Sequence, residues 1–399
     1  MAPAPEWTRR GADMTTCRGC GGAGVEQVLD LGAMPAADHF PLAGTPVTPA
    51  ETSHPLAMAL CRDCGLAQLA DDDTVPDEPR GVEPQALRDQ AAAAVRDVAD
   101  AGWLTGRTVA EFGSPHGGTW LPLLTDRGYE IVPTRRPASL VLDCFGIMHE
   151  PDQHTAFRQR TRALTADGVL LLQFHSLATI VRQRQWTALR HGHFAYYSLT
   201  ALRHLLADVG LHVADAWTFD LYGGTVLVAA TRARRPLSLA ARRILTDEKA
   251  VGVTEPVAVH ALQRAADEQA VALRTCLKTM ARQGRRVYAY GAASRAVALF
   301  ARAGLDQHLV AGVADASPAK QGRRMPGTAV PIISPEQLLR LRPDRVLLTL
   351  PDLLPEVRRR YPELDGRWMI PADHAAPRRG THGLRAARVT TGAGSEVQS

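Results

Sequence analysis

The stretch VAEFGSPHGGTW, residues 109–120, decides the fold class of the central part of the chain. An apolar, strand-like run leads into a turn with three glycines, and the segment after it, WLPLLTDRG, has a helical pattern. This order is typical of the cofactor loop of a doubly wound α/β sheet. Such sheets usually place an acidic residue about 20 residues further on, where it holds the cofactor's ribose. Here the next strand-like piece ends at Val132 and is followed by PTRR, so that acid is missing.

Strand and helix patterns alternate along the rest of the central region. We expect helices at 86–102, 152–168 and 198–210, and strands at 108–112, 139–148, 169–174, 212–219 and 224–230. A helix followed by two close strands predicts an antiparallel end to an otherwise parallel sheet. Only a few residues separate YEIVP (129–133) from SLVLDC (139–144), whereas parallel neighbours need a crossover of a dozen or more. We therefore expect that these two pieces cannot both take parallel positions, and that the sheet is truncated.

A second αβ unit follows a helical bridge that starts near residue 237. Its strand RRVYAYG (285–291) leads into a helix at 294–304, and later segments predict a βαβαβ order that ends near residue 350. Residues 65–85 are acidic and proline-rich, and predict a linker or loop. The expected fold is α/β, with a zinc-binding module at 1–75, a truncated Rossmann-like central domain at 76–235, a bridge and C-terminal Rossmann-like domain at 236–377, and a disordered tail at 378–399.

The zinc module is predicted from two C-x-x-C pairs, which consist of Cys17, Cys20, Cys61 and Cys64. Two such knuckles complete a tetrahedral four-thiolate site that leaves no position open for water, so the zinc is structural. The intervening segment is rich in proline and glycine, and metal binding would supply much of its folding free energy. Redox-active C-x-x-C pairs would need a βαβ context, which this segment lacks.

Length and charge narrow the classes of function. The chain has 399 residues, of which 45% are hydrophobic, enough for two or three cores. No apolar run reaches the roughly 20 residues of a membrane helix, and no signal peptide is recognised, so we expect a cytoplasmic protein without membrane association. The net charge of +5 comes from scattered arginines, which favours an anionic small molecule over nucleic acid.

The motifs together resemble the three-part sugar C-methyltransferases, which act on nucleotide-linked deoxy-ketosugars in antibiotic pathways. The resemblance rests on the C-x-x-C pairs with LDLGAMP (29–35), and on EFGSPHGGTWL (111–121), IMHEPD (147–152) and GHFAYYSLTAL (192–202). It continues through YGGTVLV (222–228), AYGAASRA (289–296) and DASPAKQGRRMPGTAVPI (315–332). The resemblance implies that the central domain binds S-adenosylmethionine (SAM) and that a base removes a proton next to a ketone before methyl transfer.

The family pattern places that base at His193 and a second histidine at His149. The expected SAM contacts are Glu111, Gly113, Gly117 and Gly118, and the expected contacts to a nucleotide-sugar are Tyr196, Arg295, Lys320 and Arg323. Two positions depart from the pattern, because Gly192 replaces the catalytic glutamate and Arg190 replaces a tyrosine.

Three functions remain open at this point. The first is a SAM-dependent C-methyltransferase with a remodelled pocket. The second is an enzyme of the same fold that uses histidine acid–base chemistry without SAM, and the third is a non-catalytic binding partner. The sequence does not determine the oligomeric state.

Overall fold

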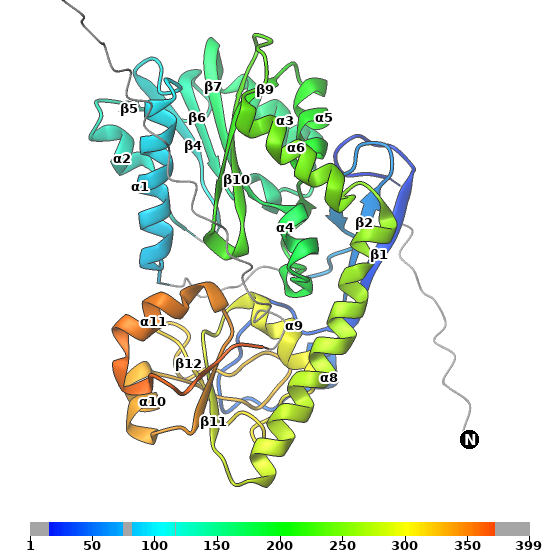
Figure 1. Ribbon diagram of the computed structural model, residues 1–399, viewed down its shortest axis with the longest axis vertical. Coiled ribbons are helices and arrows are strands. Elements are labelled where there is room, and N and C mark those ends of the chain that lie inside the picture. Colours follow the sequence, from blue (N-terminus) through cyan, green and yellow to red (C-terminus); the bar gives the residue numbers. More distant parts are fainter. Residues whose placement is uncertain (1–15, 75–81, 116, 372–399) are drawn as a thin grey trace, which may run out of the picture.

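The computed structural model describes residues 16–74, 82–115 and 117–371, which form three sheets with helices around them. Figure 1 shows the central and C-terminal domains one above the other, with the long helix α8 (Ala261–Arg282) and the N-terminal strands along one side. Sheets of this α/β kind were expected. The expected tail at 378–399 lies outside the described residues.

The N-terminal sheet has the order β1-β2-β3-β8 and is antiparallel throughout. Its strands are β1 (Val25–Met34), β2 (His54–Cys61), β3 (Ala67–Leu69) and β8 (Ala195–Tyr196). The predicted linker at 65–85 is therefore wrong at its start, where β3 pairs with β2 on one side and with β8 on the other. Three residues are too few to show a period, and the strand is stabilised by these two neighbours.

The central sheet has the order β5-β4-β6-β7-β10-β9. Its strands are β4 (Thr108–Phe112), β5 (Glu130–Ile131), β6 (Ala138–Cys144), β7 (Leu164–His175), β9 (His212–Phe219) and β10 (Thr225–Thr231). The first four strands are parallel, and β10 runs antiparallel to both β7 and β9. The predicted antiparallel end is confirmed.

The expectation that the two short pieces before and after residue 135 cannot both be parallel is wrong. Both β5 and β6 pair in parallel with β4, on its opposite sides. This is possible because β5 has only two residues and pairs with the beginning of β4, at Thr108 and Val109. The chain then reaches β6 at the same level through a turn in which the Arg136 N–H donates to the Pro133 carbonyl, 2.8 Å. Within the described residues no strand lies beyond β5, so this side of the sheet is short.

Helices cover both faces of the central sheet. The helices α1 (Gln85–Asp100) and α2 (Leu121–Thr125) bury one face, and α3 (Gln153–Arg162) and α5 (Leu199–Asp208) bury the other. Successive residues of β4 and β7 enter opposite cores, as the alternation of a strand requires. The helix predicted at 152–168 ends at Arg162, because the chain from Leu164 already belongs to β7.

The C-terminal sheet is fully parallel and has the order β13-β12-β11-β14-β15. Its strands are β11 (Val287–Tyr290), β12 (Val313–Ala314), β13 (Ile332–Ile333), β14 (Arg345–Leu348) and β15 (Trp368–Met369). Its helices are α9 (Ser294–Ala303), α10 (Pro335–Leu341) and α11 (Leu354–Arg360), and α6 (Leu239–Val251), α7 (Pro256–Val259) and α8 form the bridge. The predicted βαβαβ order is present, and β15 extends it.

The N-terminal module packs against both of the other domains. One hydrophobic core joins β1 and β2 to α8, α9 and the C-terminal sheet. The buried Arg324 donates from Nη1 to Glu51 Oε1 at 2.6 Å and from Nη2 to Glu51 Oε2 at 2.8 Å. None of the helices in the described part of the chain is long and apolar enough to cross a membrane.

Candidate functional site

The four cysteines of the N-terminal module form one cluster. Their Sγ atoms all lie within 4.8 Å of one another, with Cys17 and Cys64 at 3.6 Å and Cys20 and Cys61 at 3.7 Å. Tetrahedral zinc with Zn–S bonds of about 2.3 Å requires sulfur atoms about 3.8 Å apart. The Gly19 and Gly22 N–H groups donate to Cys17 and Cys20 Sγ, which stabilises thiolates. The residues therefore fit a structural zinc ion, as the spacing predicted.

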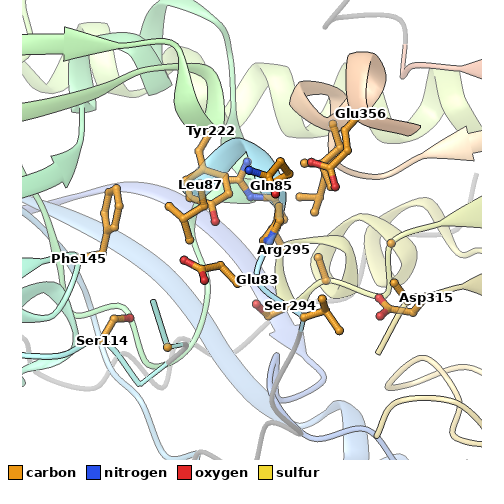
Figure 2. A pocket seen from close by; sticks show the side chains of 18 of the residues that line it. Glu83, Gln85, Leu87, Ser114, Phe145, Tyr222, Ser294, Arg295, Asp315 and Glu356 are labelled. Carbon is orange, nitrogen blue, oxygen red and sulfur yellow. The ribbon is translucent and has the colours of Figure 1, made fainter. Parts of the chain in front are cut away.

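A cavity of about 610 Å³ lies between the central and C-terminal domains (Figure 2). Its walls come from the N-terminal end of α1, the glycine loop after β4, the segments after β6 and β7, and the loops after β11 and β12. Ligands of doubly wound sheets bind outside the carboxyl ends of the strands, and this cavity joins two such edges. It is the candidate active site.

The glycine loop reaches the cavity through Ser114, Pro115 and Gly117. Gly117 has φ +86° and Gly118 has φ +82°, a left-handed conformation that favours glycine. Glu111 does not line the cavity but accepts hydrogen bonds from Thr119 Oγ1 (2.5 Å) and the Trp120 N–H (3.0 Å), and so fixes the start of α2. Gly113 and Gly118 also lie outside the cavity lining. Of the four expected SAM contacts, the structure places only Gly117 on the cavity wall.

The two histidines from the family pattern lie next to each other. Their ring centroids are 4.3 Å apart, and the rings are nearly perpendicular. His149 ends the short helix η2 (Ile147–His149) after β6, and its Nδ1 lies 2.8 Å from the Gly192 carbonyl. A carbonyl only accepts, so Nδ1 carries the proton and Nε2 the lone pair of the neutral ring. His193 Nε2 accepts a hydrogen bond from Arg190 Nε at 2.7 Å. Both histidines line the cavity.

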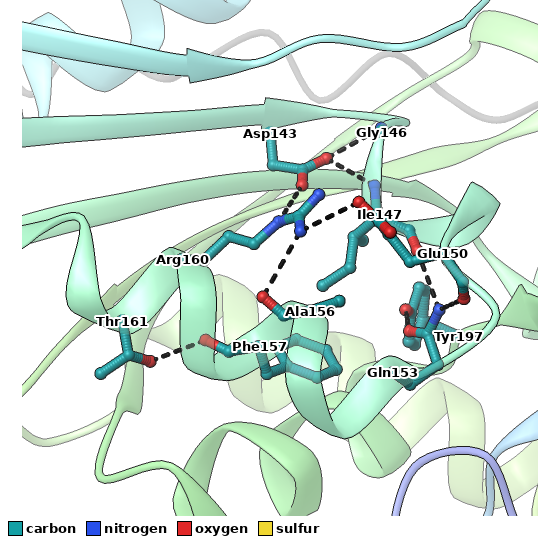
Figure 3. A network of polar contacts seen from close by, with 10 residues as sticks. All are labelled: Asp143, Gly146, Ile147, Glu150, Gln153, Ala156, Phe157, Arg160, Thr161 and Tyr197. Carbon is teal, nitrogen blue, oxygen red and sulfur yellow. Dashed lines mark hydrogen bonds and ion pairs between the residues drawn. The ribbon is translucent and has the colours of Figure 1, made fainter. Parts of the chain in front are cut away.

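A buried ion pair holds the segment that carries His149 (Figure 3). Arg160 Nε donates to Asp143 Oδ2 at 2.8 Å, and both side chains are at most 1% exposed. The other carboxylate oxygen of Asp143 accepts from the N–H groups of Gly146 (2.8 Å) and Ile147 (2.9 Å). The turn after β6 is therefore held by hydrogen bonds to a buried ion pair, in addition to apolar packing.

Three rings form an aromatic cluster on the cavity wall, namely Phe145, His175 and Tyr222. Their centroids are 4.9 to 6.1 Å apart. Phe145 has φ +64° and Tyr222 has φ +52°, values that L residues rarely adopt. Strained backbone of this kind persists where the surrounding structure holds it, and it is concentrated at functional sites.

The expected substrate contacts separate into two groups. Arg295 and Lys320 line the cavity, and Lys320 Nζ donates to the Ala292 carbonyl at 2.9 Å. Arg323 lies outside the lining and donates to the Phe40 carbonyl at 2.6 Å, so it joins the N-terminal module to the C-terminal domain. Tyr196 is also outside the lining. It is 1% exposed, its hydroxyl accepts from the Arg190 N–H at 3.1 Å, and burial raises its pKa.

Two family models match the chain. The model of the C-methyltransferase C-terminal domain matches residues 220–372, and that of a zinc binding domain matches residues 17–78. The C-methyltransferase NovU of Streptomyces niveus is 27% identical over 404 residues, which cover 89% of this chain and 94% of the relative. The chain belongs to the family of C-methyltransferases with an N-terminal zinc-binding domain.

Solved methyltransferase structures resemble part of this family member. The 1,6-didemethyltoxoflavin-N1-methyltransferase of Burkholderia thailandensis has a TM-score of 0.28 and 13% identity, over 38% of this chain and 79% of that protein. The magnesium protoporphyrin IX methyltransferase of Synechocystis has a TM-score of 0.28 and 12% identity, over 39% of this chain and 90% of that protein.

The sequence reasoning missed two carboxylates next to the histidines of this C-methyltransferase family member. Asp72, in the stretch predicted as a linker, accepts a hydrogen bond from the Gly192 N–H at 2.6 Å. Asp38 Oδ2 lies 3.6 Å from the point where a Cβ on Gly192 would stand. Gly192 replaces the family's glutamate, so both carboxylates approach the backbone from which that side chain would project. No local pattern could have paired residues more than 100 positions apart.

Proposed function

We propose that this protein is a SAM-dependent C-methyltransferase whose acceptor is a nucleotide-linked deoxy-ketosugar or a related ketone. The observation that carries the proposal is the cavity itself, because one space of about 610 Å³ is lined by the glycine loop, both histidines and basic side chains of the C-terminal domain. Methyl transfer to carbon needs a methyl donor, a base and an anchored acceptor in one space.

The histidine pair would supply the base. Removing a proton next to a ketone gives an enolate, whose carbon would then accept the methyl group that bound SAM would supply. In the neutral pair, the lone pair of His149 is on Nε2, while Nε2 of His193 is engaged by Arg190. His193, the base in the family pattern, takes up a proton at Nε2 only after Arg190 has released that atom. We therefore assign proton transfer to the pair rather than to His193 alone.

SAM would supply the electrophilic methyl group, and the glycine loop would hold it. Gly117 presents its backbone to the cavity, and a Cβ added there would meet nothing within 4 Å of it. The open space at this point fits the close backbone approach of a ligand. The residues directly after Val132 are PTRR, with no acid among them, and Arg136 pairs with Glu130 at 3.5 Å. The loss of a charge-assisted ribose contact would weaken binding about ten- to a hundredfold.

The acceptor would be anchored from the C-terminal side. Arg295 and Lys320 are both at least nine-tenths buried and line the cavity, where they would meet the phosphates of a nucleotide-sugar. The NovU relative carries the name C-methyltransferase, which supports transfer to carbon.

A second function is acid–base chemistry on a ketone without SAM. It is favoured by the short, two-residue β5, beyond which the described part of the chain adds no further strand to the sheet. One experiment separates the two functions. The protein is incubated in D₂O with nucleoside-diphosphate ketosugars, with and without methyl-labelled SAM. Label in the sugar supports the methyltransferase. Deuterium exchange next to the ketone without label transfer supports the second function and overturns the first. If neither methyl transfer nor deuterium exchange occurs with any acceptor, the result favours a non-catalytic binding role.

A further inference from the structure

Two arginines, Arg190 and Arg295, line the cavity, and Arg190 donates a hydrogen bond to Ser294, the residue directly before Arg295. Arg190 replaces a tyrosine of the family pattern, so nothing in that pattern gives it a role. Figure 2 shows Arg295 and Ser294 within the cavity, with Tyr222 nearby. The pKa of Arg295 is lowered to about 10, first by burial of its guanidinium and second by the positive charge of Arg190, which lies close to it.

Arg295 is a buried cation without a hydrogen-bonding partner in the described part of the chain. The residue is 9% exposed, and none of the hydrogen bonds or ion pairs found among residues 16–74, 82–115 and 117–371 reaches its guanidinium. Its central guanidinium carbon lies 5.9 Å from the centre of the Tyr222 ring. Charged groups are rarely buried unless they are paired, because their desolvation is costly.

Arg190 is held so that part of its fork remains available. Its Nε donates to His193 Nε2 at 2.7 Å, and its Nη1 donates to Ser294 Oγ at 2.9 Å. None of the hydrogen bonds among the described residues uses its Nη2. Ser294 begins α9, a ten-residue helix that has no side-chain cap at its N-terminus. Arginine, serine and the first N–H groups of a helix all recognise oxyanions.

The charge of the cavity lining agrees with an anionic occupant. The lining holds six arginine or lysine side chains and three carboxylates. Asp352 acts electrostatically on Arg295 but does not line the cavity.

We propose that Arg190, Arg295 and Ser294 form an oxyanion-binding subsite that takes a carboxyl or phosphoryl group of the methyl acceptor directly beside the histidine pair. This subsite rests on the proposed function, because the anionic group is taken to be part of the methyl acceptor. Because Arg190 contacts both the anion and His193, the anionic group lies about one guanidinium width from the imidazole. The reacting carbon and the anionic group are therefore close neighbours in the substrate.

The test is calorimetric titration of the full chain, without SAM, with pyrophosphate and separately with malonate at constant ionic strength. We expect at least one of the two anions to bind. Arg190→Gln and Arg295→Gln should each weaken that binding about tenfold or more, and Arg190→Lys should weaken it less because the charge stays while the fork is lost. The matched control is Arg358→Gln, which removes one positive charge outside the cavity.

Each outcome has a defined meaning. Preference for pyrophosphate assigns a phosphoryl group, and preference for malonate assigns a carboxylate. No binding of either anion at about 10 mM, or equal binding by the Arg190, Arg295 and control variants, would overturn the subsite. If a glutamine variant loses its native circular dichroism, Ser294→Ala and Arg190→Lys serve instead. Because SAM is left out, failure of SAM to bind would refute the proposed function without touching this result.

Discussion

Arg190 donates a hydrogen bond from Nε to Nε2 of His193, 2.7 Å away. The atom through which His193 would act as a base is therefore already engaged by a cation. His149, whose ring centroid lies 4.3 Å from that of His193, makes its hydrogen bond through Nδ1 instead, with the Gly192 carbonyl. The two imidazoles are thus not equivalent, and the departure from the family pattern at position 190 is what distinguishes them.

Replacing either histidine should reduce methyl transfer and leave acceptor binding largely intact. We expect His149→Ala and His193→Ala each to lower kcat by about 10² to 10⁴, the usual contribution of a positioned base. His154→Ala, on the exposed side of α3, is the control. Single-turnover assays with labelled SAM give the rates, and full activity of the His149 variant would remove that residue from the mechanism.

The zinc site should control the fold of the N-terminal module. The purified protein should contain about one zinc ion per chain, and Cys61→Ser should release it and disorder β1 to β3. Cys276→Ser, at an exposed cysteine outside the cluster, should retain the metal. Metal analysis and amide hydrogen exchange over residues 16–74 measure both effects. A metal-free protein with unchanged protection in this module would refute the prediction.

The buried Asp143–Arg160 pair should matter far more than a surface pair. Arg160→Ala leaves a fully buried carboxylate without its cation and should cost about 3 to 5 kcal/mol of unfolding free energy. Arg358→Ala, which breaks the exposed pair with Asp365, should cost about 0 to 1 kcal/mol. Urea unfolding gives both values, and similar losses in the two variants would contradict the role given to the buried network.

Acid should weaken the contact between the N-terminal module and the C-terminal domain. Burial alone would raise the pKa of Glu51, but hydrogen bonds from Arg324 and the Gly327 N–H hold it below its ordinary value. A depressed folded-state pKa stabilises the fold above the unfolded-state pKa, and this contribution is lost as pH falls through the folded-state value. Glu51→Gln should lower stability at neutral pH by about 1 to 3 kcal/mol and flatten its acid dependence. Urea unfolding between pH 7 and pH 3 tests this, and parallel curves for the two proteins would refute it.

The sequence predicted the elements whose apolar period extends over several residues. The strands at 108–112 and 212–219 have the predicted bounds, and the four cysteines meet as their spacing required. The strands β3 and β5 have three and two residues, too few for a period, and their places depend on the neighbours with which they pair.

The features that the sequence did not predict depend on contacts between segments far apart in the chain. The Gly192–Asp72 hydrogen bond joins residues 120 positions apart, and β8 adds a strand to the N-terminal sheet from the middle of the central domain. Tyr196 and Arg323, two of the expected contacts to a nucleotide-sugar, lie outside the cavity lining because of such distant contacts. The Tyr196 hydroxyl accepts a hydrogen bond from the Arg190 N–H, and Arg323 donates to the Phe40 carbonyl and joins two domains.

Calorimetric titration with SAM tests the central claim most directly. The matched variants are Gly117→Ala and Gly210→Ala, because both glycines have positive φ and neither added Cβ would meet an atom within 4 Å, but only Gly117 lines the cavity. We predict that the protein binds SAM more weakly than micromolar, since the ribose acid is missing, and that Gly117→Ala weakens binding further while Gly210→Ala does not. No detectable binding at millimolar SAM, or equal binding by the two variants, would contradict the methyltransferase site described above.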